Sequence, residues 1–387
     1  MENQKALFSL DPDVHYLNCA YMSPIMKSVE QKGIEGLIRK RNPYHLVPED
    51  FFTEVEEARS LFAEMINCRA SQIALIPSAS YGLSAAISNV SPKQGTHALI
   101  LDQEFPSDFF PLKRWCEQHD KELKVIRIEA EPGKQGEVWN HEILNQINEK
   151  TAVLVMSSVH WMNGIRFDLK AIGEKCRAND CLLIVDGTQS FGALPINVQE
   201  TNIDALVCAS YKCMMGPYSI GLAYLGEAFN EGIPLEESWM NRTNALDFRN
   251  LTDYEEKYTK DAGRYNVGEF SNFILVPMLI EALKQLKEWG PAEVQAYCRK
   301  LVQPLLEYCE SMGVQLEREE YLSAHLLGLQ LPDTIGYEKL LKLLKERKII
   351  VSVRGSTIRV SPSVYNTPED IQALITTIES CLQKVTS

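Results

Sequence analysis

The sequence predicts an α/β protein with a mostly parallel central sheet, helices on both faces of that sheet, and a smaller C-terminal α+β domain. The middle of the chain alternates short runs of Val, Ile and Leu with longer amphipathic stretches. Continuous apolar runs separated by helices are typical of parallel strands that are buried on both faces. After about residue 270 long helical patterns dominate, which indicates a second and smaller domain.

Length and composition narrow the class of protein. At 387 residues the chain exceeds the usual size of one domain. We expect a large α/β domain over residues 20–270, and a small α+β domain formed by residues 1–19 together with residues 271–387. The formal charge of −13 argues against nucleic acid or an anionic membrane as the main partner, because both attract basic surfaces.

The cysteines and the hydropathy pattern indicate the compartment. The ten cysteines are scattered, without a Cys-x-x-Cys pair or zinc-type spacing, so no metal site is predicted. No apolar run approaches the ~18 residues that a membrane span needs. The start, MENQKALFSL, lacks the charged-then-apolar pattern of a signal peptide. We therefore expect a soluble, cytoplasmic protein in a reducing environment.

Each element of the large domain follows from its own run of residues. Strands are predicted where Val, Ile and Leu run together, and helices where apolar residues recur at helical spacing among charged ones. The predicted strands are 97–102, 123–130, 151–158, 181–186, 204–210 and 220–226, and the predicted helices between them are 108–120, 140–150 and 169–180.

The small domain is predicted to contain more helix than strand. Its helical patterns cover residues 272–290, 291–313 and 337–348, and its short strands are expected at 324–332, 349–354 and 356–361. The triplet Thr367-Pro368-Glu369 is a start signal for a terminal amphipathic helix.

Polar residues at the carboxyl ends of the predicted strands are the candidates for a site, because ligands of an open α/β sheet bind there. Lys212 ends the run DALVCASYK; its amine could condense with an aldehyde, or simply reach solvent. Asp186 ends CLLIVD; it could hold a positively charged ring nitrogen, or cap the next helix. The segment SASYG (78–82) could bind a phosphate at a helix start, or be an ordinary serine N-cap.

The order of these three signals is more specific than any one of them. A phosphate turn, then an aspartate after an apolar strand, then a lysine after the next strand is the order in pyridoxal 5′-phosphate (PLP) enzymes of the aspartate-aminotransferase fold. The chain resembles the class V aminotransferase-type group of these enzymes, which contains cysteine desulfurases, kynureninase and isopenicillin N epimerase-like proteins. The segments that carry the resemblance are YLNCAYMSP (16–24), PSASYGL (77–83), DQEFPSDFFP (102–111), SSVHWMNGIRFDL (157–169), IVDGTQSFGALPI (184–196), ASYKCMMGPYSIGLAYL (209–225) and IRVSPSVYNTPEDI (358–371).

The resemblance implies PLP as the cofactor, with Lys212 as the Schiff-base lysine and Asp186 as the partner of the pyridine nitrogen. Trp161 stands where many desulfurases have asparagine, so it either contacts the cofactor or lines the substrate side. The other residues that the resemblance places at the cofactor are Ser78, Ala79 and Ser80 at the phosphate, Phe105 stacked on the ring, Gln189 near the ring hydroxyl, Ser210 and Tyr211 before the lysine, and Ser271, which in family dimers reaches the partner's phosphate.

The resemblance also implies a substrate amino acid and a homodimer with a shared active site. Arg359 matches the arginine that clamps the substrate's α-carboxylate, since a guanidinium binds a carboxylate through two parallel hydrogen bonds. Arg354, His160 and the loop 239–244 stay open between a structural role and a contact with substrate or cofactor.

The sequence lacks a cysteine that one class of candidate reactions requires. Cysteine desulfurases need a thiolate on a loop before the C-terminal arginine, but the stretch from His325 to Arg359 contains no cysteine. We expect a class V aminotransferase-type transferase. A lyase of the kynureninase or the cysteine/selenocysteine type and an epimerase remain alternatives. A non-enzymatic binding protein of the same fold is disfavoured, because both Lys212 and Asp186 are present.

Overall fold

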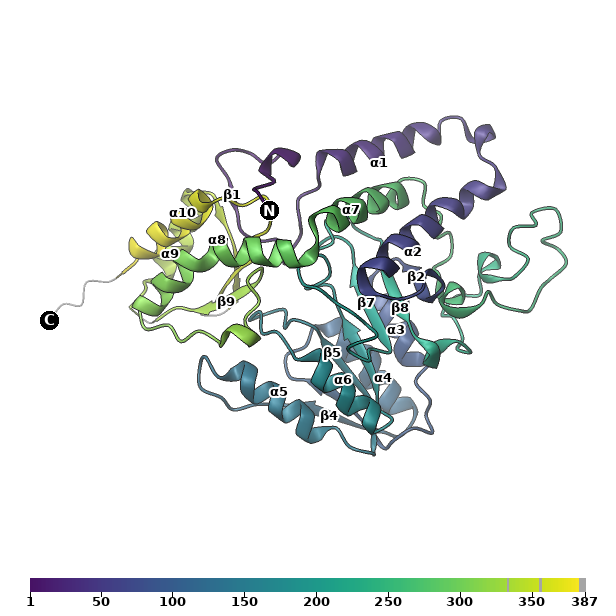
Figure 1. The fold of residues 1–387 in the computed structure, drawn as a ribbon, viewed down its shortest axis with the longest axis horizontal. Helices are drawn as coiled ribbons and strands as arrows, with labels where there is room; N and C mark the ends of the chain where they lie inside the picture. Colours follow the sequence, from purple (N-terminus) through teal and green to yellow (C-terminus); the bar gives the residue numbers. More distant parts are fainter. Residues whose placement is uncertain (333, 355–356, 383–387) are drawn as a thin grey trace.

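The computed structural model describes residues 1–332, 334–354 and 357–382, and a seven-stranded sheet lies at its centre (Figure 1). The strand order is β2-β8-β7-β6-β5-β3-β4. The strands from β7 to β4 are parallel, and β8 runs antiparallel to both of its neighbours. The predicted, mostly parallel α/β sheet is confirmed. The strands are β2 (Ile73–Ile76), β3 (His97–Leu101), β4 (Glu122–Ile126), β5 (Thr151–Ser157), β6 (Leu182–Asp186), β7 (Ala205–Ala209) and β8 (Gly221–Leu225).

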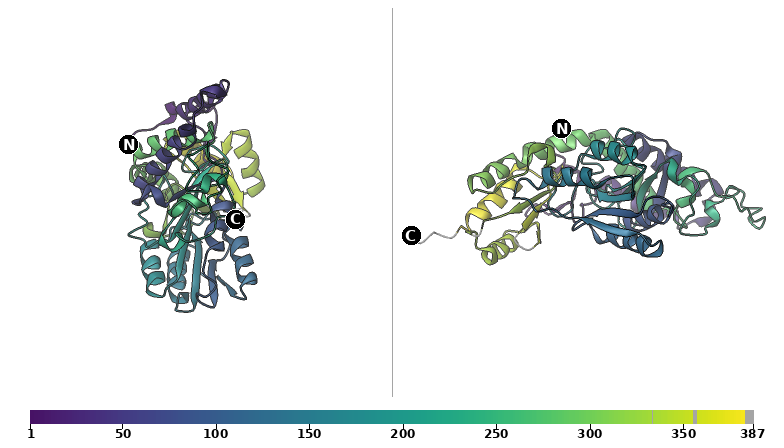
Figure 2. Two further views of the ribbon diagram at one scale, coloured as in Figure 1. Left: turned by 90° about the vertical axis from the view of Figure 1, so that its right-hand side faces the viewer. Right: turned by 90° about the horizontal axis from the view of Figure 1, so that it is seen from below.

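Helices cover both faces of this sheet. Alternate residues of each strand point to opposite sides, so each face presents its own set of apolar side chains. On β3, Ala98 and Ile100 belong to one buried apolar cluster, whereas Leu99 and Leu101 belong to another. The first cluster includes residues of α3 and α4, and the second includes residues of α2, α5, α6 and α7; Figure 2 shows the strands between the two helical layers. These helices are α2 (Thr53–Ile66), α3 (Ala79–Ser88), α4 (Pro106–Gln118), α5 (Gln135–Gln146), α6 (Leu169–Ala178) and α7 (Leu275–Trp289).

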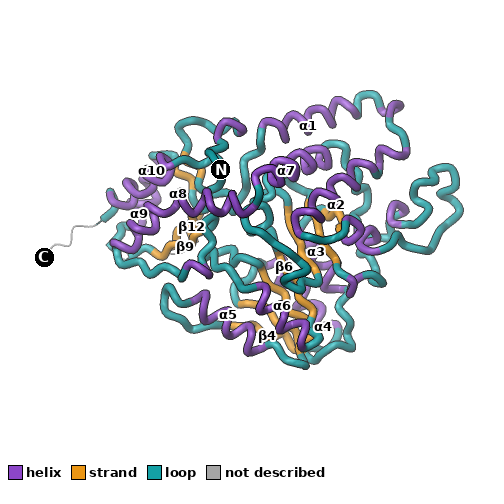
Figure 3. The backbone as a smooth tube through the Cα atoms, viewed as in Figure 1, coloured by secondary structure: helices purple, strands orange, loops and turns teal. Residues whose placement is uncertain are grey.

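The C-terminal part contains a three-stranded antiparallel sheet of order β11-β12-β9, next to three further helices (Figure 3). The predicted helix start at Thr367 is confirmed, because the Thr367 N–H donates to Asp370 Oδ2 at 2.9 Å in a capping box. The elements are α8 (Pro291–Ser311), β9 (Leu327–Gln330), α9 (Tyr337–Glu346), β11 (Ser352–Arg354), β12 (Thr357–Val360) and α10 (Pro368–Glu379).

The first residues of the chain lie against this C-terminal part. Strand β1 (His15–Tyr16) pairs in parallel with β10 (Ile349–Ile350), and a further bridge joins Asn18 to Ser361. The division of the chain at residues 19 and 270 stays a prediction.

Helix α1 (Lys27–Arg39) lies along α7 (Figure 1). A Cβ atom at Gly36 would lie 2.2 Å from the backbone oxygen of Phe273, so this close approach requires glycine. Elsewhere α1 leaves Ile34, Leu37 and Ile38 exposed. Within the described residues, no helix is long and apolar enough to cross a membrane.

Candidate active site

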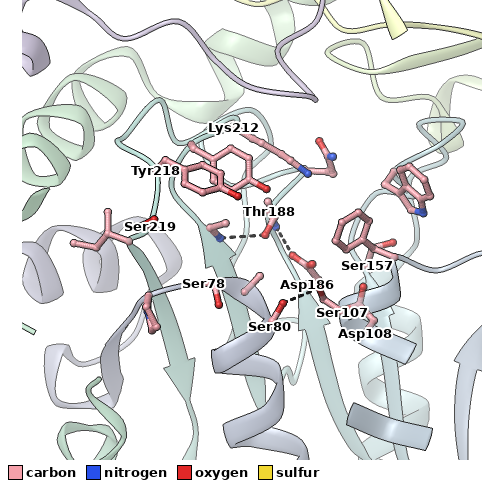
Figure 4. A pocket seen from close by; sticks show the side chains of 18 residues that line it. Ser78, Ser80, Ser107, Asp108, Ser157, Asp186, Thr188, Lys212, Tyr218 and Ser219 are labelled. Atoms are coloured by element: carbon pink, nitrogen blue, oxygen red, sulfur yellow. Dashed lines mark hydrogen bonds between the residues drawn. The ribbon is translucent and has the colours of Figure 1, made fainter. Parts of the chain in front are cut away.

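A cavity of about 290 Å³ opens at the carboxyl ends of the parallel strands (Figure 4). It draws residues from the ends of β2, β3, β5, β6 and β7 and from the turn before β8. Nine of the residues singled out in the sequence line it: Ser78, Ala79, Ser80, Phe105, Trp161, Asp186, Gln189, Tyr211 and Lys212. The fold therefore brings together residues that lie far apart in the sequence. Ser78 and Lys212, for example, are separated by 134 positions in the chain.

Lys212 and Asp186 are the two charged centres of this cavity. Burial lowers the pKa of Lys212, against the attraction of Asp186, which favours the ammonium form. Asp186 ends β6 and is 8 % exposed, and its Oδ1 accepts the backbone N–H of Thr188 at 2.8 Å. Burial raises the pKa of Asp186, whereas Thr188 and Lys212 favour the carboxylate. Because Thr188 and Lys212 are the groups that favour this buried carboxylate, a cation bound beside Asp186 would be stabilised by it.

The N-terminus of α3 forms one wall of the cavity. Ser78 Oγ accepts the N–H of Tyr81 at 3.2 Å, so this serine is the N-cap of α3. Ser80 Oγ lies 2.7 Å from Ser107 Oγ, which joins the first turn of α3 to the first turn of α4. A helix N-terminus with hydroxyl groups beside it can bind a phosphate through N–H donors and the helix dipole.

Aromatic rings form the opposite wall. Phe105 and Trp161 meet edge to face, with ring centroids 5.5 Å apart, and Trp161 Nε1 donates to the backbone oxygen of Gln103 at 2.8 Å. Phe105 is 37 % exposed, so it is not part of the core. Its ring centroid lies 5.5 Å from Lys212 Nζ. A planar ring bound in front of Lys212 has a flat aromatic partner here.

Gln189 is held in place from two distant parts of the chain. Its Nε2 donates to the backbone oxygen of Ala20 at 3.2 Å, and its own backbone oxygen accepts from His325 Nε2 at 2.6 Å. The Gln189 Oε1 atom is buried and has no hydrogen-bond partner among the described residues. An amide oxygen left in this way at a cavity wall can accept a hydrogen bond from a bound ligand.

Three of the predicted site residues do not line the cavity. Ser210 donates its hydroxyl to the backbone oxygen of Pro217, and Ser271 is buried elsewhere. Arg359 on β12 is buried near Lys212; its Nη1 donates to the backbone oxygen of Trp161 at 2.9 Å and its Nη2 to Ser352 Oγ at 3.3 Å. Arg359 thus reaches the edge of the site from the small sheet.

Of the residues left open in the sequence, His160 and the loop 239–244 lie outside the cavity wall. His160 packs on Trp139 and lies 3.0 Å, through Nδ1, from Asn163 Oδ1; burial lowers its pKa to about 4. In the loop 239–244, the buried Asn241 donates Nδ2 to the backbone oxygens of Arg264 and Asn266. Both residues therefore have structural partners. The side chain of Arg354 lies outside the described residues.

The sequence reasoning missed several residues of the cavity wall. They are Pro77, Ser107, Asp108, Ser157, Thr188, Ala209, Tyr218, Ser219 and Ile220. Asp108 looked like an ordinary acidic residue in a first helical turn, yet it is fully buried and neither of its carboxyl oxygens has a hydrogen-bond partner among the described residues. An acidic residue three positions after Phe105, in the segment that follows an apolar strand, is the signal that could have found it.

The residues present fit a phosphorylated pyridine ring. The cavity offers an anion site at α3, a flat ring at Phe105, a carboxylate at Asp186, a lysine amine and unpartnered polar atoms at Gln189 and Asp108. Residues 37–374 match the family model described as Aminotransferase class-V. The chain belongs to this family. PLP is therefore its cofactor, and the chain is a PLP-dependent enzyme of class V.

Individual relatives have different activities. The chain is 27 % identical to YcbU, an uncharacterized aminotransferase of Bacillus subtilis, over 92 % of its own length and 90 % of the relative's. It is 24 % identical to a kynureninase of Shouchella clausii, over 90 % of its length and 81 % of the relative's. The apo structure of a cysteine desulfurase from Thermococcus onnurineus superposes with a TM-score of 0.83 at 18 % identity, covering 99 % of this chain and 98 % of that one. That likeness shows the fold.

Proposed function

We propose that this class V enzyme is a transferase that removes the amino group of an amino acid substrate. The observation that carries the proposal is the placement of Lys212, Asp186 and the N-terminus of α3 around one cavity of about 290 Å³. A group transfer of this kind needs only a lysine base, a partner for the ring nitrogen and a carboxylate clamp, and all three are candidates here. When bound, PLP supplies an aldehyde carbon and an electron-withdrawing ring.

In this proposal Lys212 has two tasks. Its amine would hold the cofactor through the aldehyde carbon, and its Nζ would accept the proton from the substrate's Cα. Burial favours the neutral amine, which is the form that both tasks require. Asp186 would hold the ring nitrogen in its protonated form, because its buried carboxylate gains from a second positive charge beside that of Lys212.

Arg359 is proposed to bind the substrate's carboxylate. It comes from the small sheet, and its hydrogen bond to the Trp161 oxygen places the guanidinium at the edge of the cavity. Ser78, Ala79, Ser80 and Tyr211 are proposed to hold the phosphate, and Phe105, Trp161 and Gln189 the ring. The geometry gives Ser210 no direct part in this, since its hydroxyl is bound to Pro217.

A desulfurase-type reaction with an enzyme thiolate is disfavoured. Of the cysteines in the described residues, Cys68 is half-buried and the others are buried. In the pair beside Lys212, contact with Cys19 and burial raise the pKa of Cys213, whereas contact with Cys213 lowers the pKa of Cys19; both thiols are buried, which opposes their use as a mobile nucleophile. A lyase of the kynureninase type is the second candidate, because Tyr211 and Phe105, which carry the sequence resemblance to kynureninase, line the cavity, and the chain is similar to a kynureninase over most of its length.

A second copy of the chain is the proposed partner, and the cytoplasm is the proposed compartment. Tyr218 lines the cavity and is nevertheless 61 % exposed, and Tyr21 and Ile25 are exposed as well. A contiguous exposed apolar patch marks an interface, and Tyr218 is proposed to belong to one that a second copy covers. Ser271 is proposed to act in the partner's site.

The products test the proposed function. The protein, loaded with PLP, is incubated with each common amino acid, with and without a 2-keto acid as amino acceptor. A transferase forms a new amino acid, and more than one equivalent of keto acid per active site, only when the acceptor is present. Alanine or another fragment, formed together with a cleaved side chain and without an acceptor, would instead establish the lyase.

A further inference from the structure

Three carboxyl groups lie together in and behind the wall of the cavity. Asp186 ends β6, Asp108 lies in the first turn of α4, and Glu104 is in the loop between β3 and α4. Asp186 and Asp108 line the cavity directly, as Figure 4 shows, and Glu104 lies behind Ser157, which also lines it. We call these three residues the carboxyl cluster.

The oxygens of the cluster are poorly supplied with hydrogen-bond donors. Glu104 Oε1 accepts the N–H of Ser157 at 2.7 Å and its hydroxyl at 3.0 Å. Glu104 Oε2 and both carboxyl oxygens of Asp108 are buried and have no partner among the described residues. A buried carboxylate without donors is costly, whereas a buried neutral carboxyl is much less so.

Few positive charges compensate the cluster. Glu104 is repelled by the charge of Asp186. Asp108 is repelled by Asp186 and Glu104, and it is attracted by the cation Lys212. Burial raises the pKa of Glu104 to about 7, with Asp186 adding to the increase, and it raises the pKa of Asp108 well above its usual range. Three negative charges are therefore not held at once with Lys212 as the cation that faces Asp108, and the cluster keeps protons near neutral pH.

We infer that the carboxyl cluster releases a proton to solvent when a protonated pyridine ring binds beside Asp186. This inference rests on the proposed function of the site. The positive ring nitrogen compensates Asp186, so the repulsion on Glu104 and Asp108 falls. The O–H bond of one of these carboxyls then breaks, the electron pair stays on the carboxylate, and the proton leaves to the buffer. The ring brings its own proton, so the charge change is balanced. Cofactor loading is in this way linked to pH by carboxyl groups other than Asp186, the proposed partner of the ring nitrogen.

The number of protons released on loading tests this inference. The apo protein is titrated with PLP by calorimetry at about pH 6.5, just below the pKa of about 7 of Glu104, in two buffers with different enthalpies of ionisation. The difference in heat gives the number of protons released. Glu104→Gln keeps an oxygen for Ser157 but cannot ionise, so we expect fewer protons released than by the wild type. The pH dependence of the dissociation constant should also flatten, by up to about tenfold per pH unit.

Matched variants separate the possible failures. Glu117→Gln removes an exposed carboxyl from the same helix as Asp108 and should leave the proton count unchanged. If Glu104→Gln does not fold, Asp108→Asn is used, with the same expected loss. Equal proton counts in the wild type and the cluster variant, with PLP still bound, would overturn this inference alone. No binding of PLP to the wild type would overturn the proposed function instead. Inorganic phosphate, which has no ring, should release the same number of protons in both proteins.

Discussion

The guanidinium of Arg359 donates a hydrogen bond from Nη1 to the backbone oxygen of Trp161, 2.9 Å away. This contact joins β12 of the small sheet to the loop that follows β5 of the large one. Trp161 in turn donates Nε1 to the backbone oxygen of Gln103. The substrate-binding candidate and the aromatic wall of the cavity are therefore fixed relative to each other.

Arg359→Lys keeps the positive charge and removes the planar pair of donors. We expect KM for the amino acid to rise by roughly 10²-fold, about 2–3 kcal/mol, because one paired, charge-assisted contact is lost. The affinity for PLP, measured by titration of the apo protein, should stay unchanged. A large loss of PLP affinity with an unchanged KM would place Arg359 at the cofactor rather than at the substrate.

Asp186→Asn keeps an acceptor for the Thr188 N–H and removes the charge. We expect kcat to fall by roughly 10²- to 10³-fold, the usual cost of removing one charge that stabilises the reacting centre. Asp204→Asn is the matched control. Asp204 is a half-buried carboxyl whose pKa burial raises to about 6, and it accepts the N–H of Leu183, but it lies at the amino end of β7, away from the cavity. Equal losses in the two variants would mean that Asp186 acts through the fold alone.

The buried histidines predict acid lability. Burial lowers the pKa of His160 and of His325 to about 4, below the usual value of 6.5. The unfolded chain therefore binds more protons than the folded one between about pH 6.5 and pH 4, and stability falls as the pH falls through this window. Each histidine accounts for up to about 3 kcal/mol.

His160→Gln should remove part of this pH dependence. The measurement is the free energy of unfolding in urea at several pH values, compared with the wild type. Glu104 and Asp204 have raised pKa values and act in the opposite direction, so the difference between variant and wild type is the quantity to follow. The exposed His141→Gln is the control, with no expected difference from the wild type. A His160→Gln curve parallel to that of the wild type would contradict the account.

The exposed apolar side chains of α1 predict that a charge introduced on this helix will weaken dimer formation. Leu37 is 57 % exposed on this helix, next to Ile38. If α1 lies in the interface of a homodimer, Leu37→Glu should shift the protein to monomers in sedimentation and weaken PLP binding. Leu341→Glu on α9 changes a leucine of similar exposure away from α1 and should leave both unchanged. A Leu37→Glu protein with the sedimentation of the wild type would exclude α1 from an interface.

The parallel strands were predictable to within a few residues, because each is a continuous apolar run with both faces covered. The predicted strand 123–130 is the main exception, since β4 ends at Ile126. β4 is an edge strand with β3 as its one neighbour in the sheet, so nothing holds the next residues in the ladder. The predicted helix 140–150 instead spans Gln135–Gln146 as α5.

The residues that line the candidate site were predictable where a reactive side chain follows a strand within a known motif. They were not predictable where a backbone turn decides which way a side chain points. Lys212 and Asp186 follow strands whose ends are fixed by the sheet. Ser210 also follows a strand, but a turn comes directly after it, in which the Gly216 N–H donates to the backbone oxygen of Ser210. In this turn the Ser210 hydroxyl donates to the backbone oxygen of Pro217 and does not point into the cavity. The burial of Asp108 depends on how α4 packs on the sheet, and a single sequence does not contain that information.

The attachment point of the cofactor is the most direct test of the account. The purified protein, loaded with PLP, is reduced with borohydride, which converts a carbon–nitrogen double bond to a stable amine, and then digested and mapped by mass spectrometry. The account predicts the cofactor's mass on the peptide that contains Lys212, and none in Lys212→Ala. Attachment at another lysine, or none in the wild type, would contradict it.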